Sequence, residues 1–356
     1  MSIMSMIGYD HYATGDIPLA SAAALLAQPF KVPMPDGSVL ALNSQLGVGS
    51  ANHTLAIAES ADDPTTKQLR WTISGTNNNA ANATRLTLPF GASGANRTGV
   101  WYVGLRLIVD TLPSRSTRFV KIGTAMSGDI WGPSAVGEYF LEFIADYSLP
   151  AASGLTIYVN GEKVGTANSA SAITIGQNYG VEFGSYYWAF ASGSVFSIRD
   201  IYFVADLEGD ENPTGRLGPC RVRTSRPASF TGNRWESTNE QTPVEVLGKP
   251  ITSDLTPAVL ASAFGDVATA RFDTPPTQAN YGDALAVQVN ILGTRKSSAQ
   301  VRLKHGLVES EETVDALSTT VKTILIDVQE TPPGGGAWSD DKIKAVAVSL
   351  SGVQGL

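Results

Sequence analysis

The sequence predicts an all-β protein built from two β-sandwiches with few short helices, and three observations carry that prediction. Turn formers are abundant, with 35 Gly and 19 Pro in 356 residues. Charged residues make up only 16%, against ~25% in an average soluble domain, while 43% of residues are hydrophobic and can fill a core. From residue 100 onward, short β-rich segments are separated by Gly, Pro, Asn and Ser clusters, which is typical of sandwiches and barrels. At ~150 residues per domain, the length favours two domains.

The first sandwich is predicted from a series of short strands with alternating or β-rich composition. The clearest turn is Asn160-Gly161, between LTIYV and EKVG. Both central residues of a type I′ hairpin turn need positive φ, which Asn and Gly adopt most easily. The strands are expected at 100–109, 118–122, 138–146, 155–159, 181–183 and 195–204.

A boundary between the two sandwiches is predicted at 205–219. This segment, ADLEGDENPTGRLGP, is acidic, contains Gly and Pro and has no periodicity, as expected of a linker. The second, smaller sandwich is expected to use strands at 220–224, 243–247, 285–292, 299–303 and 322–328. The predicted organisation is an N-terminal arm or docking segment (1–34), a first sandwich (35–206), a linker (207–219) and a C-terminal sandwich (220–356).

Three short helices are expected, at 19–26, at 256–264 and for a turn or two after Ser339. Ser339 can cap free backbone N–H groups at the start of the last helix. Asp340 and Asp341 follow it, where carboxylates favour the positive end of the helix dipole.

Charge and cysteine content disfavour several classes of protein. The 25 basic and 33 acidic residues give a net charge of −8 without any basic run, which disfavours nucleic-acid and anionic-membrane partners. Cys220 is the single cysteine, so an intrachain disulfide and a Cys-based zinc site are excluded and a small, partly buried hydrophobic side chain is expected there. Residues 1–9 lack the features of a secretory signal, and 18–30 falls short of the ~18–20 apolar residues that span a bilayer. We therefore expect synthesis in the cytoplasm without membrane insertion.

No enzyme is predicted. A β-sandwich glycosidase needs two carboxylates ~5–10 Å apart, and one strand, 138–146, offers several on one face: Glu138, Glu142 and Asp146. Residues four apart on a strand lie ~13 Å apart, and the position between Glu138 and Glu142 on that face is Phe140. We expect the solvated polar face of an antiparallel sheet rather than an active site.

The histidines and glycines also carry no catalytic motif. His11, His53 and His305 have no metal-site spacing and adjoin no Gly-x-Ser-x-Gly motif, so surface or capping positions are expected for them. No Gly cluster precedes a predicted helix in the manner of a phosphate or dinucleotide loop.

One acidic segment is a candidate calcium site. Asp206, Glu208 and Asp210 place hard oxygen ligands at alternating positions, as calcium sites do. The segment lacks the EF-hand pattern, and a hydrated linker is the alternative. No other cofactor is expected.

One aromatic segment is a candidate glycan-binding site. Tyr186, Tyr187 and Trp188 lie between Gly and Ser residues, and their flat apolar faces can stack on sugar rings. Packing under a loop or at a subunit interface is the alternative.

Two sets of motifs resemble known proteins. The hairpin LTIYVNGEKVG and the strand SIRDIYFVAD resemble the concanavalin/laminin-G type of jelly roll, over roughly residues 35–206. In the second half, the order of four segments resembles a group of bacteriophage virion proteins that join a lectin-like sandwich to a second β domain. In that group the final segment is more often helical, whereas 345–348 is β-branched here, so the last element is left open. The four segments are LGPCRVRTSRP (217–227), NRWES (233–237), ALAVQVNILGTRKS (284–297) and GGGAWSDDKIKAVAVSL (334–350).

The resemblance implies a virion structural protein, either a tail appendage or fibre or a baseplate-associated subunit, exposed on the particle and able to bind host glycan. A capsid decoration or head-fibre protein is the nearest alternative, and a free carbohydrate-binding module is the second. A glycan hydrolase would need a carboxylate pair that the sequence does not offer. The partners implied are other virion proteins, further copies of the chain (a trimer by analogy) and host surface polysaccharide.

Overall fold

The chain folds into two compact units. Unit 1 comprises Met1–Asp10 and Thr14–Val222, and unit 2 comprises His11–Ala13 and Arg223–Leu356. Residues 215–222 thus belong to unit 1, although the sequence assigns them to a linker and to the start of the second sandwich. The computed structural model describes residues 2–17, 28–33, 39–44, 47–49, 53–73, 85–89, 100–112, 120–122, 131–146, 155–166, 180–184, 193–206, 215–251, 258–273, 284–295, 300–308, 310–319 and 322–354.

The all-β prediction is confirmed. The named strands pair antiparallel throughout the described residues, which hold two short helices, α2 (Pro243–Leu247) and α3 (Asp340–Lys344). Neither of these helices is long and apolar enough to cross a membrane.

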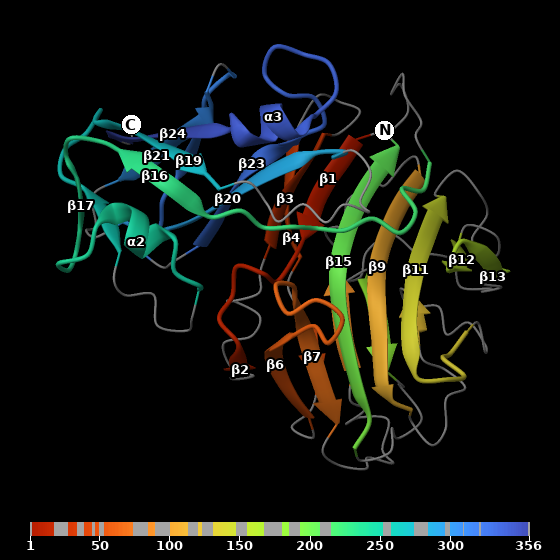
Figure 1. The fold of residues 1–356 in the computed structure, drawn as a ribbon. Coiled ribbons are helices and arrows are strands. Elements are labelled where there is room, and N and C mark those ends of the chain that lie inside the picture. The colour runs from red at the N-terminus through yellow and green to blue at the C-terminus, as the bar shows by residue number, and fades with distance from the viewer. Residues whose placement is uncertain are drawn as a thin grey trace. The chain divides into compact units, whose positions relative to one another are not determined.

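Unit 1 is built on a nine-stranded main sheet, with a second sheet of four strands (Figure 1). The main sheet has the order β13-β12-β11-β9-β15-β7-β6-β2, with β1 also paired to β15, and the second sheet has the order β10-β14-β8-β5. The strands are β1 (Ser2–Ile7), β2 (Gly15–Ile17), β3 (Gln28–Pro33), β4 (Val39–Ser44), β5 (Gly47–Gly49), β6 (His53–Glu59), β7 (Lys67–Ile73), β8 (Arg85–Pro89), β9 (Val100–Thr111), β10 (Val120–Ile122), β11 (Gly137–Asp146), β12 (Leu155–Val159), β13 (Glu162–Thr166), β14 (Gly180–Gly184) and β15 (Val195–Asp206).

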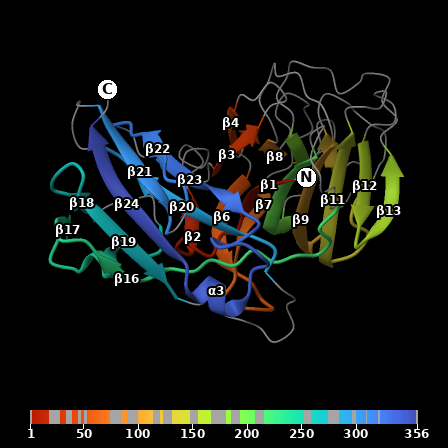
Figure 2. The ribbon, with the colours of Figure 1, turned by 90° about the horizontal axis from the view of Figure 1, so that it is seen from above.

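One face of the main sheet forms the core of unit 1. Side chains of a strand alternate between faces, and the residues of β9 that share one face are all buried: Trp101, Val103, Leu105, Leu107 and Val109. Buried aromatic side chains of neighbouring strands extend this apolar layer, among them Trp71, Phe143, Phe196 and Phe203. Figure 2 shows β8 of the second sheet on one side of the main sheet and the green segment after β15 on the other.

The N-terminus does not form a separate arm. β1 pairs with β15 from Ser2↔Ala205 to Ile7↔Ile201, and Ile3 and Ile7 are buried. The register shifts between Ile3 and Ser5, so residues 2–7 join the main sheet with a β-bulge. The predicted helix at 19–26 lies outside the described residues.

The Asn160-Gly161 hairpin is confirmed. It joins β12 to β13, and φ is 51° at Asn160 and 87° at Gly161, the positive values that a type I′ turn needs. The Asn160 side chain accepts a 2.8 Å hydrogen bond from the backbone N–H of Phe140 on β11, which ties the turn to the next strand.

Unit 2 contains a five-stranded sheet of order β16-β19-β24-β21-β22 and the pairs β17-β18 and β20-β23. Its small core gathers Val289, Leu307, Val348 and Leu350, with partly buried Phe230 and Trp235 packed against it. The strands are β16 (Pro227–Thr231), β17 (Trp235–Ser237), β18 (Val259–Ala261), β19 (Val267–Phe272), β20 (Val287–Gly293), β21 (Val301–Leu307), β22 (Thr313–Ala316), β23 (Lys322–Gln329) and β24 (Ala347–Gln354).

Two predicted elements of unit 2 have the wrong type. The expected strand at 243–247 is helix α2, because Thr242 and Glu245 form a capping box and Pro243 occupies the first turn, and these local signals outweigh the β-branched composition. The expected helix at 256–264 is wrong at 259–261, where β18 pairs with β17.

The C-terminal segment ends in a strand. Ser339 caps α3 as predicted, and Trp338 beside it is buried and donates a 2.8 Å hydrogen bond from Nε1 to the carbonyl of Gln329. The last element, which the sequence left open between helix and strand, is strand β24. It lies at the centre of its sheet between β19 and β21.

Candidate functional site

The face of the main sheet opposite the core of unit 1 carries the buried charged side chains Arg106, Glu142 and Arg199 beside the exposed Glu138. We call it the polar face. Cross-strand register aligns residues of β11, β9 and β15 in rows across this face. One row holds Phe140, Arg106 and Arg199, and the next holds Glu142, Gly104 and Tyr202. The polar face comprises residues 138, 140, 142, 144 and 146 of β11, residues 100, 102, 104, 106 and 108 of β9, and residues 197, 199, 202, 204 and 206 of β15.

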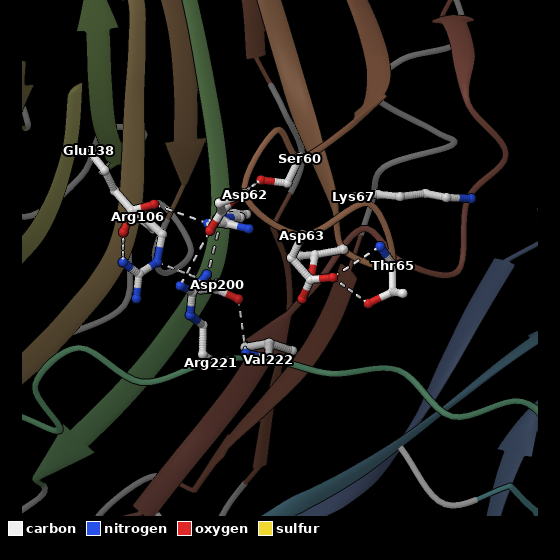
Figure 3. A network of polar contacts seen from close by, with 12 residues as sticks. Ser60, Asp62, Asp63, Thr65, Lys67, Arg106, Glu138, Asp200, Arg221 and Val222 are labelled. Carbon is white, nitrogen blue, oxygen red and sulfur yellow. Dashed lines mark hydrogen bonds and ion pairs between the residues drawn. The ribbon is translucent and has the colours of Figure 1, made fainter. Parts of the chain in front are cut away.

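Two buried arginines, Arg106 and Arg199, organise one part of the polar face. Figure 3 shows Arg106 between Glu138 and Asp200. Arg106 contacts Asp200 through Nε at 3.0 Å and also pairs with Glu138. Arg199, 1% exposed, contacts Asp62 at 2.9 Å and Glu138 at 3.0 Å through Nη2. Since a buried charge is tolerated only when paired, each arginine depends on these carboxylates.

Asp200 reaches the polar face through a bulge. The register of β15 against β9 shifts between Arg199 and Tyr202, and Asp200 has a φ of 52°. An extra residue in one strand re-aims its side chain, and Asp tolerates the left-handed conformation better than most residues. Buried Asp200 thereby accepts from Arg106, from Arg221 at 3.3 Å and from the backbone N–H of Val222 at 3.0 Å.

Glu142 is the second buried carboxylate of the polar face. It is 1% exposed and accepts from the Tyr202 hydroxyl at 2.7 Å, the Gly218 backbone N–H at 3.0 Å and Arg216 Nη1 at 3.0 Å. The Arg216 guanidinium also lies 3.8 Å from the ring centroid of Tyr158, a cation–π contact. Burial and the adjacent Glu142 charge raise the pKa of Tyr202, so its hydroxyl remains a donor.

The segment Gly215–Val222, which we call the strap, crosses the polar face and is anchored on both buried carboxylates. Gly218 N–H bonds to Glu142 and Val222 N–H bonds to Asp200. The strand predicted at 220–224 is absent, because these backbone donors bind side chains of the sheet instead of a neighbouring strand. Burial and the charge of Asp200 raise the pKa of the Cys220 thiol to about 12, which leaves it a weak nucleophile.

Asp62 stands at the solvent edge of this network. Its loop is fixed by Asp63, whose carboxylate accepts from Thr65 and Thr66. Burial raises the pKa of Asp62, but hydrogen bonds from Ser60 and Arg199 and the Arg199 charge outweigh that effect and lower it to about 2. Asp62 is therefore a carboxylate at neutral pH.

The structure places some of the residues predicted from sequence on one face of the main sheet. Glu138 and Glu142 do share one face, but Glu142 is buried and bonded, so the expectation of a solvated face is wrong there. Asp206 ends β15, while Glu208, Asp210 and the aromatic candidates Tyr186, Tyr187 and Trp188 lie outside the described residues. Among the residues described, no group of three or more His, Cys, Asp or Glu side chains is placed to hold a metal.

Sequence reasoning missed the arginines and Asp200. The signal was present, because Arg106 interrupts the apolar run VWYVGLRLIV and Arg199-Asp200 interrupt VFSIRDIYFV. Charged residues in a strand that is otherwise apolar on both faces predict buried, paired charges.

The surface position expected for the histidines is wrong for His305. On β21 of unit 2 it has 0% exposure, and its Nε2 lies 2.5 Å from Oδ2 of Asp315 on β22. This carboxylate partner makes burial of the imidazole tolerable. His11 is half-buried against Tyr12, and the side chain of His53 is outside the description.

Comparison with known proteins identifies no family: no protein-family model and no curated protein sequence matches the chain. Solved structures that resemble it include a sialidase, at 9% identity over 45% of this chain and 17% of the sialidase chain, with a TM-score of 0.30. The binding domain of botulinum neurotoxin DC in complex with rat synaptotagmin II aligns at 9% identity over 83% and 78% of the two chains, TM-score 0.27. A structure concerned with the cell entry of botulinum neurotoxin type C, dependent on two ganglioside molecules, aligns at 7% identity over 95% and 100%, TM-score 0.29. Similarity at these scores establishes neither a shared fold nor a shared function.

Proposed function

We propose that the chain is a carbohydrate-binding protein without catalytic activity, built on a β-sandwich. The observation that carries the proposal is the state of the carboxylates on the polar face. Glu142 accepts three hydrogen bonds, one of them from Arg216, and Glu138 is paired with Arg106 and Arg199. A glycosidase needs one carboxyl group that gives up a proton and one that attacks or activates water, and carboxylates held by arginines suit neither task.

The polar face also has partly exposed aromatic side chains that can bind sugar. Tyr102 and Tyr158 are partly exposed, and Tyr158 is fixed by the Arg216 contact. Sugar sites combine an aromatic face with a few polar groups, and rings held by a rigid sheet lose little conformational freedom on binding.

The experiment is a glycan array probed with the full chain, followed by calorimetric titration of each hit and an assay for newly formed reducing ends. We expect saturable binding and no release of reducing ends. Release that is lost in Glu142→Gln would contradict the proposal, and so would the absence of binding to any glycan.

A virion structural role is the second candidate, and the resemblance of the second half to bacteriophage virion proteins favours it. The motifs that carry the resemblance lie on architectural parts: the strap contains LGPCRV, β17 contains WES, and Trp338 and Ser339 precede α3. This second proposal includes a location on the tail or on the head of the particle and the assembly of several copies of the chain. Antibody labelling of purified particles tests it: label on particles supports the role, and particles free of the protein would contradict it.

A further inference from the structure

We propose that the end of the polar face beyond the strap is the sugar-binding site, formed by Tyr102, Asp146 and Asp206, and that it takes neutral or amino sugars rather than acidic ones. The inference rests on the proposed function and adds its location and ligand class.

Cross-strand register brings the three side chains to one place. Val100 on β9 pairs with Asp146 on β11 and, from the other side, with Asp206 on β15. The two aspartates therefore flank Val100 on the same face, with their Cα atoms ~10 Å apart across two strand spacings. Tyr102 is the next residue of β9 on that face, ~7 Å along the strand.

Exposure separates this end from the rest of the polar face. Tyr102, Asp146 and Asp206 are partly exposed, whereas the rows under the strap are closed, with Glu142 and Arg199 each 1% exposed. The floor between them is apolar, since Val100 and Ile144 face the same way and are also partly exposed. An aromatic ring on an apolar floor with two carboxylates at its rim matches a sugar, which presents C–H groups on one face and hydroxyls at its edge.

The electrostatics of the site fix the donor and acceptor roles. Burial raises the pKa of Tyr102, and the charges of Asp206 and Asp146 raise it further. The phenol therefore stays protonated at neutral pH and can donate a hydrogen bond, while the carboxylates accept from sugar hydroxyls. Hydrogen bonds to charged acceptors are the stronger ones.

The same charges set the specificity. Two carboxylates beside one ring repel the carboxylate of a uronic or sialic acid and attract the ammonium of an amino sugar. The geometry thus favours neutral and amino sugars.

The test uses the full chain and the best neutral or amino-sugar hit from the array. Tyr102→Ala and Asp206→Asn should each weaken binding about tenfold or more, because each removes a contact made by an aromatic or charged group. Asp110→Asn is the matched control: it lies near the other end of β9, in an exposed pair with Arg70, and should leave the affinity unchanged. Unchanged melting temperatures of the Tyr102 and Asp206 variants show that the fold is retained.

Four results would overturn the inference. No binding to any glycan removes both the site and the proposed function. Binding that survives both variants contradicts the site but not the proposed function. If Trp188→Ala alone then abolishes binding, the sugar site lies in the aromatic segment predicted from sequence. Preference for sialylated or uronic ligands contradicts the charge argument. Binding abolished by EDTA would replace direct recognition with a cation-bridged contact, whereas binding that persists in EDTA supports the site as described.

Discussion

At the scale of single residues, the polar face depends on one glycine. A Cβ at Gly104 would lie 2.0 Å from Cε1 of Tyr202, so only glycine leaves room for the Tyr202 ring at this point of β9. From that position the phenol reaches Glu142 on the far side of β9. The absence of a side chain at residue 104 is thus a condition for satisfying a buried carboxylate.

Gly104→Ala should destabilise unit 1 by about 2–4 kcal/mol, because the methyl group displaces Tyr202 and Glu142 loses a donor. Urea unfolding measures the effect. Gly352→Ala on β24 is the control, since a Cβ there meets no atom within 4 Å. Equal stability of the two variants would show that Tyr202 does not need this space.

The lowered pKa of Asp62 predicts that the stability of the protein depends on pH below about pH 4. A carboxyl whose pKa falls from 3.8 to about 2 on folding adds stability above its unfolded value, and this contribution is lost as the pH falls from about 4 to about 2. Asp62→Asn should lower the melting temperature at pH 7 slightly, because a half-exposed pair is worth about 1 kcal/mol or less. The difference from the wild type should vanish near pH 2; a constant difference from pH 7 to pH 2 would contradict the assignment.

At the scale of elements, the strap converts a predicted linker into part of the sandwich. The segment 205–219 has the composition of a linker, but its final residues supply one backbone donor, Gly218 N–H, and one side-chain donor, Arg216, to Glu142. Local composition could not reveal this, because the carboxylate that binds the strap lies more than seventy residues earlier in the chain.

Strap docking can be measured through Cys220. With a thiol pKa of about 12 against an ordinary value near 9, its thiolate fraction near pH 8 falls by about three orders of magnitude, and alkylation should slow accordingly. Glu142→Gln weakens the anchor of the strap and should accelerate labelling by iodoacetamide, while Glu236→Gln on β17, an exposed residue, should not. Fast labelling of the wild type would contradict docking.

Strand prediction succeeded where the pattern was local and failed where distant residues decide. The strands around 100–109, 138–146 and 195–204 and the Asn160 turn follow from alternation and turn chemistry. The strand at 243–247 was predicted from β-branched composition, although the capping-box pair Thr242 and Glu245, with Pro243 in the first turn, is visible in the sequence. The pairing of β1 with β15 and the buried ion network depend on contacts between distant segments, which no local pattern contains.

At the scale of the whole molecule, unit 1 extends to Val222, whereas the sequence predicts a linker at 207–219 and the second sandwich from residue 220. A fragment of residues 1–222 keeps the strap donors to Glu142 and Asp200, whereas a fragment of residues 1–206 lacks them and leaves Glu142 with Tyr202 and Asp200 with Arg106. Removing one partner of a buried charge costs about 3–5 kcal/mol. We expect cooperative thermal unfolding of the longer fragment only, as followed by circular dichroism; equally cooperative unfolding of the shorter one would contradict the role of the strap.

The chain as a whole is proposed to bind carbohydrate on a rigid sheet whose central carboxylates are committed to structure. The most direct test is calorimetric titration of the full chain with its best glycan from the array, run beside a reducing-end assay on the same sample. Saturable binding without bond cleavage is the result expected. Cleavage of the glycan, or no heat of binding with any sugar, would contradict the claim.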